Sequence, residues 1–426
     1  MNGRRRRHDC GMAVSEALCR RVVAPFLTAV LCGYAAAPAG AQALVPTLTL
    51  REYWRLDAVA EDFPAVSRVL VGRQGRMAVP ITQDMELRFY SADGRLEGRV
   101  GRRGGGPGEF QHVQNLGWQG DTLWINDERQ RRITFIAPDR RVLRVAGYAM
   151  PEGVSHLQVP DAIGARMVAF NPGAFLTNGT VLGVADASPD SSSEQRAWGG
   201  GRFVVSVSQG GHARVLLTAP AVGDRRWAVS AEGLGARLPF AYVPQIAFAG
   251  DGSLFGHVTY RVSPNGSGSF TVAVFSSDGD TAFVRTFGYE AIPLITSERD
   301  SALAAMLPSG GAVDGAMAGG GASALAKAVR NAMPRFHAPV DGLLFGVDGT
   351  IWVLRRAERG SGPSVLALDS EGRTFGILRL PRGSRLRQAS ATDIWVTEAD
   401  EDGLTSIVRY RVFGPRDTSA NPRSPS

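Results

Sequence analysis

One short pattern recurs along the chain and constrains its fold more than any other feature: a turn containing Gly or Asp, followed by alternating apolar residues. It begins at Gly75, Gly120, Gly179, Gly252, Gly349 and Thr392. In three of these copies a tryptophan occupies the same place, at Trp124, Trp352 and Trp395. Alternation with a period of two over this length predicts a half-buried β-strand in each copy.

Each copy is preceded by a short apolar segment and followed by a hairpin. Pairs such as Asp-Gly and Gly-Gly at the hairpin tips supply the positive φ angles that tight turns require. The first five hairpins span 86–100, 131–145, 202–217, 270–287 and 364–380. The sixth copy has only one following strand, 406–413, whereas 48–56 is a strand without a unit of its own.

Four strands in each of six units predict an all-β chain folded as a six-bladed β-propeller. Pairing of 48–56 with the last strand would close the sixth blade and remove exposed edges. An eight-stranded sandwich, or two separate β domains, is the alternative. A helical insertion with a glycine-rich hinge, residues 297–333, is expected between blades 4 and 5. It either covers one face of the ring or acts as a lid.

The first 43 residues form a segment of a different kind. An arginine cluster precedes the apolar run Val22–Ala37, and the segment ends Ala41-Gln42-Ala43, a pattern typical of an export signal peptide. An uncleaved anchor is the alternative, and the pair Arg20-Arg21 leaves twin-arginine export open. We expect an exported protein of the periplasm or the extracellular space, with no membrane span after cleavage. The propeller domain would span 44–414, and a disordered tail 415–426.

Cysteine and charge narrow the class of partner. All three cysteines lie inside the signal segment, so the rest of the chain has no disulfide or thiolate chemistry. The formal net charge of +7 falls to +3 without that segment. No dense basic stripe with interleaved aromatic residues is present, so we expect no binding of nucleic acid. We expect a monomer.

The corner Gly101–Phe110 carries a family resemblance. Its sequence GRRGGGPGEF, together with the hairpin tips FYSADGRL and ALDSEGRT, resembles the six-bladed propellers of the NHL/TolB-like group of exported bacterial proteins. The resemblance covers most of residues 47–413 and implies the fold. That group includes binding modules, scaffolds and a few hydrolases or lyases, so the resemblance implies no single activity.

The corner is interpreted as structural. No helix and no Lys-Ser/Thr pair follow its glycines, so it does not match a phosphate-binding loop. We expect its glycines to let the chain cross between blades, Phe110 to fill the seam, and Glu109 to pair with Arg102 or Arg103. The sequence also contains no G-x-S-x-G elbow, no H-E-x-x-H motif and no catalytic residue that we could identify. Residues 400–403 faintly resemble a calcium loop, but a solvated hairpin turn is the favoured interpretation.

Seven residues are candidates for ligand binding on the loop-rich face, where inner strands of propellers converge. They are Glu109, His112, Asp127, Arg129, Trp227, His257 and Arg261. The alternative for each is hydrogen bonding without a ligand, and for Trp227 a place in the core. An exposed Trp227 would suit a sugar or a peptide.

The leading functional hypothesis is a non-catalytic propeller that binds a partner protein or a small ligand, including a carbohydrate. The alternative is a metal-dependent lactonase or esterase similar to gluconolactonase. That resemblance implies a central divalent ion such as calcium, for which Asp127 and Asn126 are candidates, although no complete ligand set is found. A third hypothesis is a structural module of the cell surface or of a protein complex.

Overall fold

The computed structural model describes residues 45–63, 66–113, 115–147, 166–188, 201–208, 212–219, 227–229, 235–306, 321–357 and 360–415. The predicted signal peptide and nearly all of the predicted tail lie outside these residues. So does 307–320, which contains most of the predicted glycine hinge.

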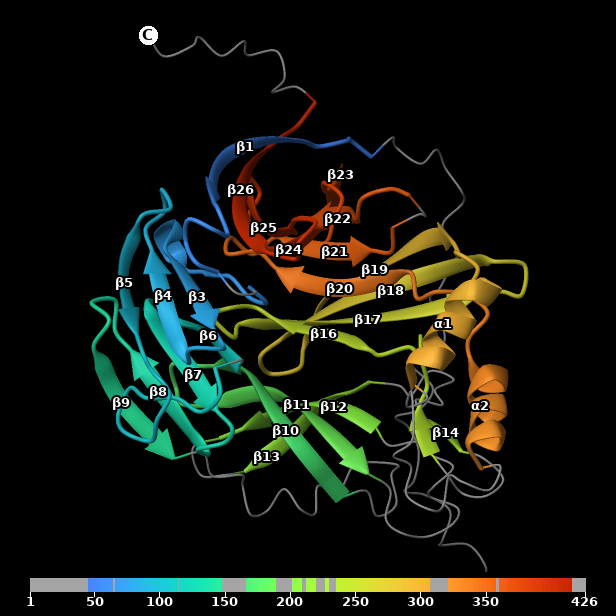
Figure 1. Ribbon diagram of the computed structural model, residues 1–426, viewed down its shortest axis with the longest axis horizontal. Helices are drawn as coiled ribbons and strands as arrows, with labels where there is room; N and C mark the ends of the chain where they lie inside the picture. The colour runs from blue at the N-terminus through green and yellow to red at the C-terminus, as the bar shows by residue number, and fades with distance from the viewer. Residues whose placement is uncertain are drawn as a thin grey trace, which may run out of the picture. The chain divides into compact units, whose positions relative to one another are not determined.

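Six four-stranded antiparallel sheets form the blades of a six-bladed β-propeller, which confirms the prediction from the repeat (Figure 1). Blade 1 consists of β2 (Leu70–Val71), β3 (Met77–Ile81), β4 (Glu86–Tyr90) and β5 (Leu96–Val100). Blade 2 consists of β6 (Asn115–Gln119), β7 (Thr122–Asp127), β8 (Arg132–Ile136) and β9 (Val142–Gly147). Blade 3 consists of β10 (Arg166–Phe175), β11 (Val181–Ser188), β12 (Gly201–Val207) and β13 (Ala213–Ala219).

The remaining blades follow the same order. Blade 4 consists of β16 (Gln245–Phe248), β17 (Leu254–Val262), β18 (Ser267–Ser276) and β19 (Thr281–Glu290). Blade 5 consists of β20 (Val340–Phe345), β21 (Ile351–Arg355), β22 (Ser364–Leu368) and β23 (Thr374–Arg379). Blade 6 consists of β24 (Ser384–Ala389), β25 (Asp393–Ala399), β26 (Thr405–Phe413) and β1 (Thr49–Leu56).

Strand β1 fills the outer position of blade 6. It pairs antiparallel with β26, from Thr49 opposite Phe413 to Leu56 opposite Ile407, with one bulge on the way. The indole nitrogen of Trp54 donates a hydrogen bond to Ala92 O at 3.1 Å, in the β4–β5 turn of blade 1. The strand therefore connects the N-terminal part of the described chain to two blades at once.

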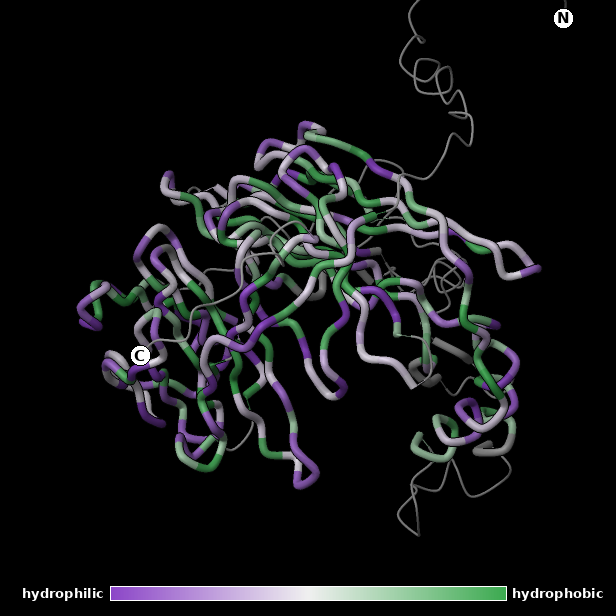
Figure 2. The backbone as a smooth tube through the Cα atoms, turned by 90° about the horizontal axis from the view of Figure 1, so that it is seen from above, coloured by the Kyte–Doolittle hydropathy of each residue, from purple (hydrophilic) through white to green (hydrophobic). Residues whose placement is uncertain are grey.

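Apolar faces of neighbouring blades pack against each other. Figure 2 shows hydrophobic and hydrophilic residues alternating along the strands, with hydrophilic residues at many hairpin tips. The three repeat tryptophans are buried and lie in clusters with the next blade around the ring: Trp124 with Phe175 of blade 3, Trp352 with residues of blade 6, and Trp395 with residues of blade 1. Their shared place in the repeat thus has a packing cause, because the same strand position faces the next blade.

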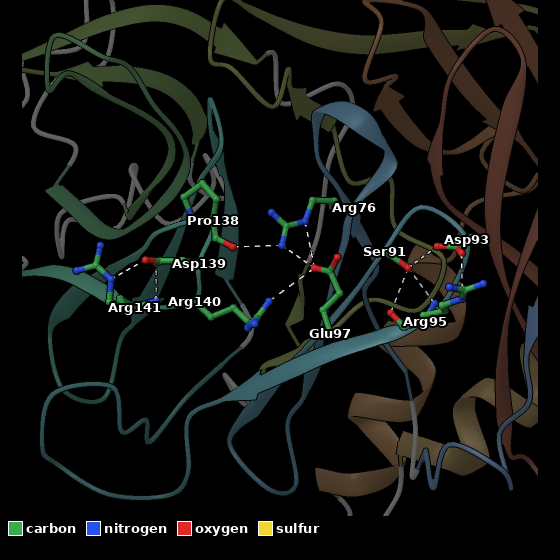
Figure 3. A network of polar contacts seen from close by, with 9 residues as sticks. All are labelled: Arg76, Ser91, Asp93, Arg95, Glu97, Pro138, Asp139, Arg140 and Arg141. Carbon is green, nitrogen blue, oxygen red and sulfur yellow. Dashed lines mark hydrogen bonds and ion pairs between the residues drawn. The ribbon is translucent and has the colours of Figure 1, made fainter.

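Polar contacts also join blades 1 and 2. Figure 3 shows Glu97 of β5 between two arginines, with its carboxylate 2.5 Å from Arg76 and 3.8 Å from Arg140. Arg76 also donates a hydrogen bond to Pro138 O at 3.1 Å, in the β8–β9 turn. The network is partly exposed, so we assign it a modest contribution to stability.

Two helices, α1 (Thr296–Met306) and α2 (Gly321–Ala332), lie between β19 and β20 in the chain. Leu303, Leu325 and Val329 of these helices share a buried cluster with Leu238. Leu238 directly follows a ribbon of two strands, β14 (Trp227–Val229) and β15 (Gly235–Arg237), which contacts α2. Strands of three residues are too short to show a period in the sequence, so this ribbon was not predicted.

The two helices are held to each other and to the chain before β20. The His337 ring nitrogen Nε2 lies 3.1 Å from Glu298 of α1, and Arg330 of α2 lies 2.8 Å from Asp300. Within the parts of the chain described above, neither helix has the length and apolarity needed to cross a membrane.

Candidate functional site

The inner strands enclose a central channel. Neighbouring inner strands contact each other from β6 through β10, β16, β20 and β24 to β2. They line a cavity of about 1000 Å³ to which all six blades contribute residues. Inner strands converge in this way in propellers because each blade is one sheet arranged radially around a common axis.

The cavity extends along the inner strands from one set of turns to the other. Gly72, Asp251 and Gly349 lie in turns between the first and second strands of their blades. Glu128, in the turn between β7 and β8, and Arg202 of β12 also line the cavity and come from the opposite ends of the blades. A ligand in this channel would therefore be surrounded by side chains from all six blades.

Apolar and polar groups alternate in the lining. Leu70, Leu116, Ile246 and Leu343 contribute apolar surface. The lining side chains that carry or can carry charge are Arg68, Arg202, Arg387, His112, Glu128 and Asp251. Asp251 is engaged in its own turn, where its Oδ1 accepts hydrogen bonds from the Ser253 amide and hydroxyl.

Arg68 and Arg387 come from blades 1 and 6 and form what we name the cation pair. Arg387 is the extra residue of a β-bulge in β24. Its neighbour Leu386 pairs with Val396 of β25, and its other neighbour Gln388 pairs with Trp395. A bulge changes the direction of a side chain, which explains how an arginine in an inner strand lines the channel. Its Nε donates to Thr397 Oγ1 at 2.8 Å, and its Nη2 lies 3.5 Å from Val66 O.

Both members of the cation pair have perturbed pKa values. Burial, followed by the positive charges of Arg385 and Arg68, lowers the pKa of Arg387 to about 10. The pKa of Arg68 is also lowered, and burial is the cause. By its accessible surface, however, Arg68 is exposed to solvent. The two observations agree if the guanidinium lies in a water-filled channel surrounded by protein, where solvation is weaker than in bulk solvent.

Among the predicted residues, His112 lines the channel. Its Nδ1 is buried and has no hydrogen-bond partner within the described residues. This nitrogen has almost no accessible surface, so it does not face the channel and is not itself an argument for a ligand there.

Two of the other predicted residues, Asp127 and Glu109, support the corner. Asp127 is fully buried and accepts hydrogen bonds from the amides of Gln111 and Gln130 and from the Gln130 side chain. Glu109 pairs with Arg102 at 2.6 Å, and Arg129 is exposed in the turn after β7. A Cβ at Gly101 (φ +102°) would lie 2.7 Å from the ring of buried Phe110, so only glycine fits this crossing.

The structure does not bring His257 and Arg261 together with His112. His257 lies in the middle of β17, which continues to Val262. It is 4% exposed, and Arg261 is exposed near the end of the strand. Neither lines the channel. Trp227 opens β14 opposite Arg237.

Asn126, the second residue proposed from the gluconolactonase resemblance, is fully buried outside the channel lining. Neither polar atom of its side chain has a hydrogen-bond partner within the described residues. No group of three or more His, Cys, Asp or Glu side chains in those residues is placed to hold a metal ion. Asp400 accepts the amide of Leu404 at 2.8 Å, a contact that fits a hairpin turn.

The buried His257 gives a prediction about acid stability. Burial lowers the pKa of His257 to about 4, against about 6.5 in an unfolded chain. The unfolded chain therefore binds the proton first, so this contribution to stability is complete above pH 6.5 and is lost as the pH falls toward 4. At pH 5 the loss should be about 2 kcal/mol.

Urea unfolding at pH 7.5 and pH 5 checks this expectation. His257→Asn should lose less stability between the two pH values than the unmodified protein does. His212→Asn, which removes an exposed histidine, should leave the pH dependence unchanged. Equal acid sensitivity of all three proteins would contradict the assignment.

Comparison with known proteins finds similar structures but no similar sequences. The chain matches no family model and no curated protein sequence. It is similar to a member of the DUF4221 family from Bacteroides vulgatus, with a TM-score of 0.48 and 12% identity, over 86% of this chain and 99% of that chain. It is also similar to regucalcin, a calcium-binding protein from Agrobacterium tumefaciens, with a TM-score of 0.37 and 14% identity, over 87% and 97%.

A third structure with similarity is virginiamycin B lyase from Staphylococcus aureus, with a TM-score of 0.38 and 11% identity, over 86% of this chain and 100% of that chain. At these identities and TM-scores, none of the three similarities indicates what this chain does.

Proposed function

We propose that this protein is an exported β-propeller that binds a small ligand in its central channel, and that recognition is its function. The observation that carries the proposal is the cavity of about 1000 Å³ lined by all six blades. Small-molecule sites in proteins are typically cavities of about 300–1,000 Å³, so this channel is large enough for such a ligand. Export is supported by the N-terminal segment, with its arginines, its apolar run and Ala41-Gln42-Ala43.

Asp127 and Asn126 were the candidates for a metal site of the gluconolactonase type. Their geometry favours ligand recognition over metal-dependent hydrolysis. Asp127 has hydrogen-bond donors on both carboxylate oxygens, and Asn126 is buried away from the channel lining. The charged lining instead contains three arginines and two carboxylates, Glu128 and Asp251. Such a lining suits a ligand that accepts hydrogen bonds.

A thermal-shift screen with a blocked channel tests the proposal. The panel comprises neutral sugars, amino acids, dicarboxylates, phosphate, a simple lactone and calcium chloride. At least one compound should raise the melting temperature saturably, because binding to the native state alone stabilises it by RT ln(1 + [L]/Kd). Ser67→Trp, which places an indole in the channel lining, should abolish that shift.

Arg95→Trp is the matched control, since Arg95 lies in the β4–β5 turn and its side chain is 86% exposed. It should bind like the unmodified protein. Binding that survives Ser67→Trp would place the site elsewhere. Hydrolysis of the lactone that depends on calcium and disappears in Ser67→Trp would favour the enzymatic alternative.

A further inference from the structure

We infer that the channel selects an organic anion, whose carboxylate or phosphate group is bound by Arg68 and Arg387. This inference rests on the proposed function, because it names the ligand class of the same channel. Three features carry it: the convergence of two cations from different blades, the absence of a carboxylate partner for either, and apolar surface beside them.

The cation pair is assembled from opposite ends of the chain. Arg68 lies in the segment that leads into β2, and Arg387 lies in β24, which contacts β2. The guanidinium of Arg387 reaches Val66 O, two residues before Arg68. The charges of Arg68 and Arg385 both act on Arg387. Three positive charges therefore gather where blades 6 and 1 meet.

No carboxylate in the described part of the chain pairs with Arg68 or Arg387, and Arg68 makes no hydrogen bond there. Two arginines of low exposure elsewhere in the described chain do have a carboxylate partner. Arg88 lies 2.7 Å from Glu86, and Arg409 lies 3.0 Å from Asp393. Arginine remains charged at neutral pH, so the cation pair places positive charge without a carboxylate partner on the wall of the channel.

An anion bound between Arg68 and Arg387 would offset the repulsion between their positive charges. It would also accept hydrogen bonds from their N–H groups. A guanidinium binds carboxylate and phosphate groups through two parallel N–H donors, and such charged hydrogen bonds are stronger than neutral ones. Arg387 uses Nε and Nη2 for protein contacts, whereas the donors of Arg68 have no partner among the described residues. His112 belongs to the same lining.

The rest of the lining argues for an organic ligand instead of a bare inorganic ion. Val69 and Leu70 follow Arg68 directly, and Leu386 precedes Arg387, all in the lining of the cavity. The volume of about 1000 Å³ is far larger than a single phosphate requires. The anionic group would thus be fixed by the cation pair while the remainder contacts apolar side chains.

Titration with succinate and with inorganic phosphate tests the inference. Each is followed by thermal shift and calorimetry against sodium chloride of equal ionic strength, since salt screens exposed charges. The unmodified protein should show a saturable shift with at least one probe. Arg68→Gln and Arg387→Gln should each weaken that binding roughly 10- to 100-fold. Arg95→Gln, at an exposed turn, should change nothing.

A charge reversal gives a readout that does not depend on the probe. Arg387→Glu would pair with Arg68, so without anion its melting temperature should exceed that of Arg387→Gln, and it should not respond to either probe. If the variants at position 387 fold poorly, anion binding by Arg68→Gln tests the inference instead. That substitution removes no hydrogen bond to another described residue, so it should not disturb folding.

Two results would overturn the inference. One is the lack of any saturable response of the unmodified protein to succinate and phosphate at matched ionic strength. The other is an equal response of the unmodified protein and Arg68→Gln. If neutral compounds still bind and Ser67→Trp blocks them, the ligand class is wrong while the binding function stands. A response to succinate alone indicates a carboxylate ligand, and a response to phosphate alone a phosphorylated one.

Discussion

Removal of residues 45–56 is expected to abolish cooperative folding of the propeller. Blade 6 would keep three strands, and β26 would present an unpaired edge that favours aggregation. The same segment also binds blade 5, because the Leu48 amide donates to Ile377 O and the Ile377 amide to Pro46 O, each at 2.8 Å. Leu48 and Leu56 are buried, so their apolar contacts are lost as well.

We expect the loss to be at least about 5 kcal/mol, which is comparable to the whole stability of many domains. A chain that begins at residue 57 should elute as aggregate in size-exclusion chromatography and show no cooperative urea transition. The matched control begins at residue 45 and should unfold cooperatively. Identical urea midpoints for the two chains would contradict the role of β1.

A disulfide between β1 and β26 should increase the stability of the propeller. Arg51 and Arg411 are exposed and directly opposite each other in β1 and β26. Cysteines at both positions would be the only ones in a chain without the first 43 residues. Their disulfide should stabilise the ring by up to about 4 kcal/mol, since it closes a very long loop. Reduction should remove the gain, and a gain that persists after reduction would rule out this cause.

The strand repeat predicted the architecture because packing between blades imposes the same pattern on each copy. Trp124, Trp352 and Trp395 share a place in the repeat because each faces the next blade. The corner at Gly101 was predictable for a similar reason, since a close approach to Phe110 permits no side chain. Such local constraints leave a visible trace in the sequence.

The channel residues left a weaker trace. Arg387 belongs to the segment RLRQA, and the bulge that turns it into the channel has no sequence pattern of its own. Arg68 interrupts an apolar inner segment, which was the one available signal for it. Their proximity depends on how blade 6 meets blade 1, and no local pattern contains that information. The ribbon of β14 and β15 was missed because each of its strands has only three residues, too few to show a period.

Asp127, one of the seven candidate residues, makes hydrogen bonds that hold the local structure together. Its Oδ2 accepts the Gln111 amide and the Gln130 side chain, each at 2.7 Å, and its Oδ1 accepts the Gln130 amide at 3.1 Å. Gln130 in turn donates to Gly104 O at 3.0 Å. The carboxylate therefore joins the turn after β7 to the corner between blades 1 and 2.

Asp127→Ala should reduce the free energy of unfolding by about 4 kcal/mol, because three donors lose a charged acceptor inside the protein. Asp127→Asn keeps the volume but turns an amide group toward those donors, so it should cost nearly as much. Asp121→Ala, at an exposed position of the same blade, should change stability by less than about 0.5 kcal/mol. Urea midpoints of the three variants provide the measurement. If Asp127→Asn kept its stability but no longer bound a ligand, Asp127 would instead belong to the binding site. Only loss of a direct ligand contact would change binding without changing the free energy of unfolding.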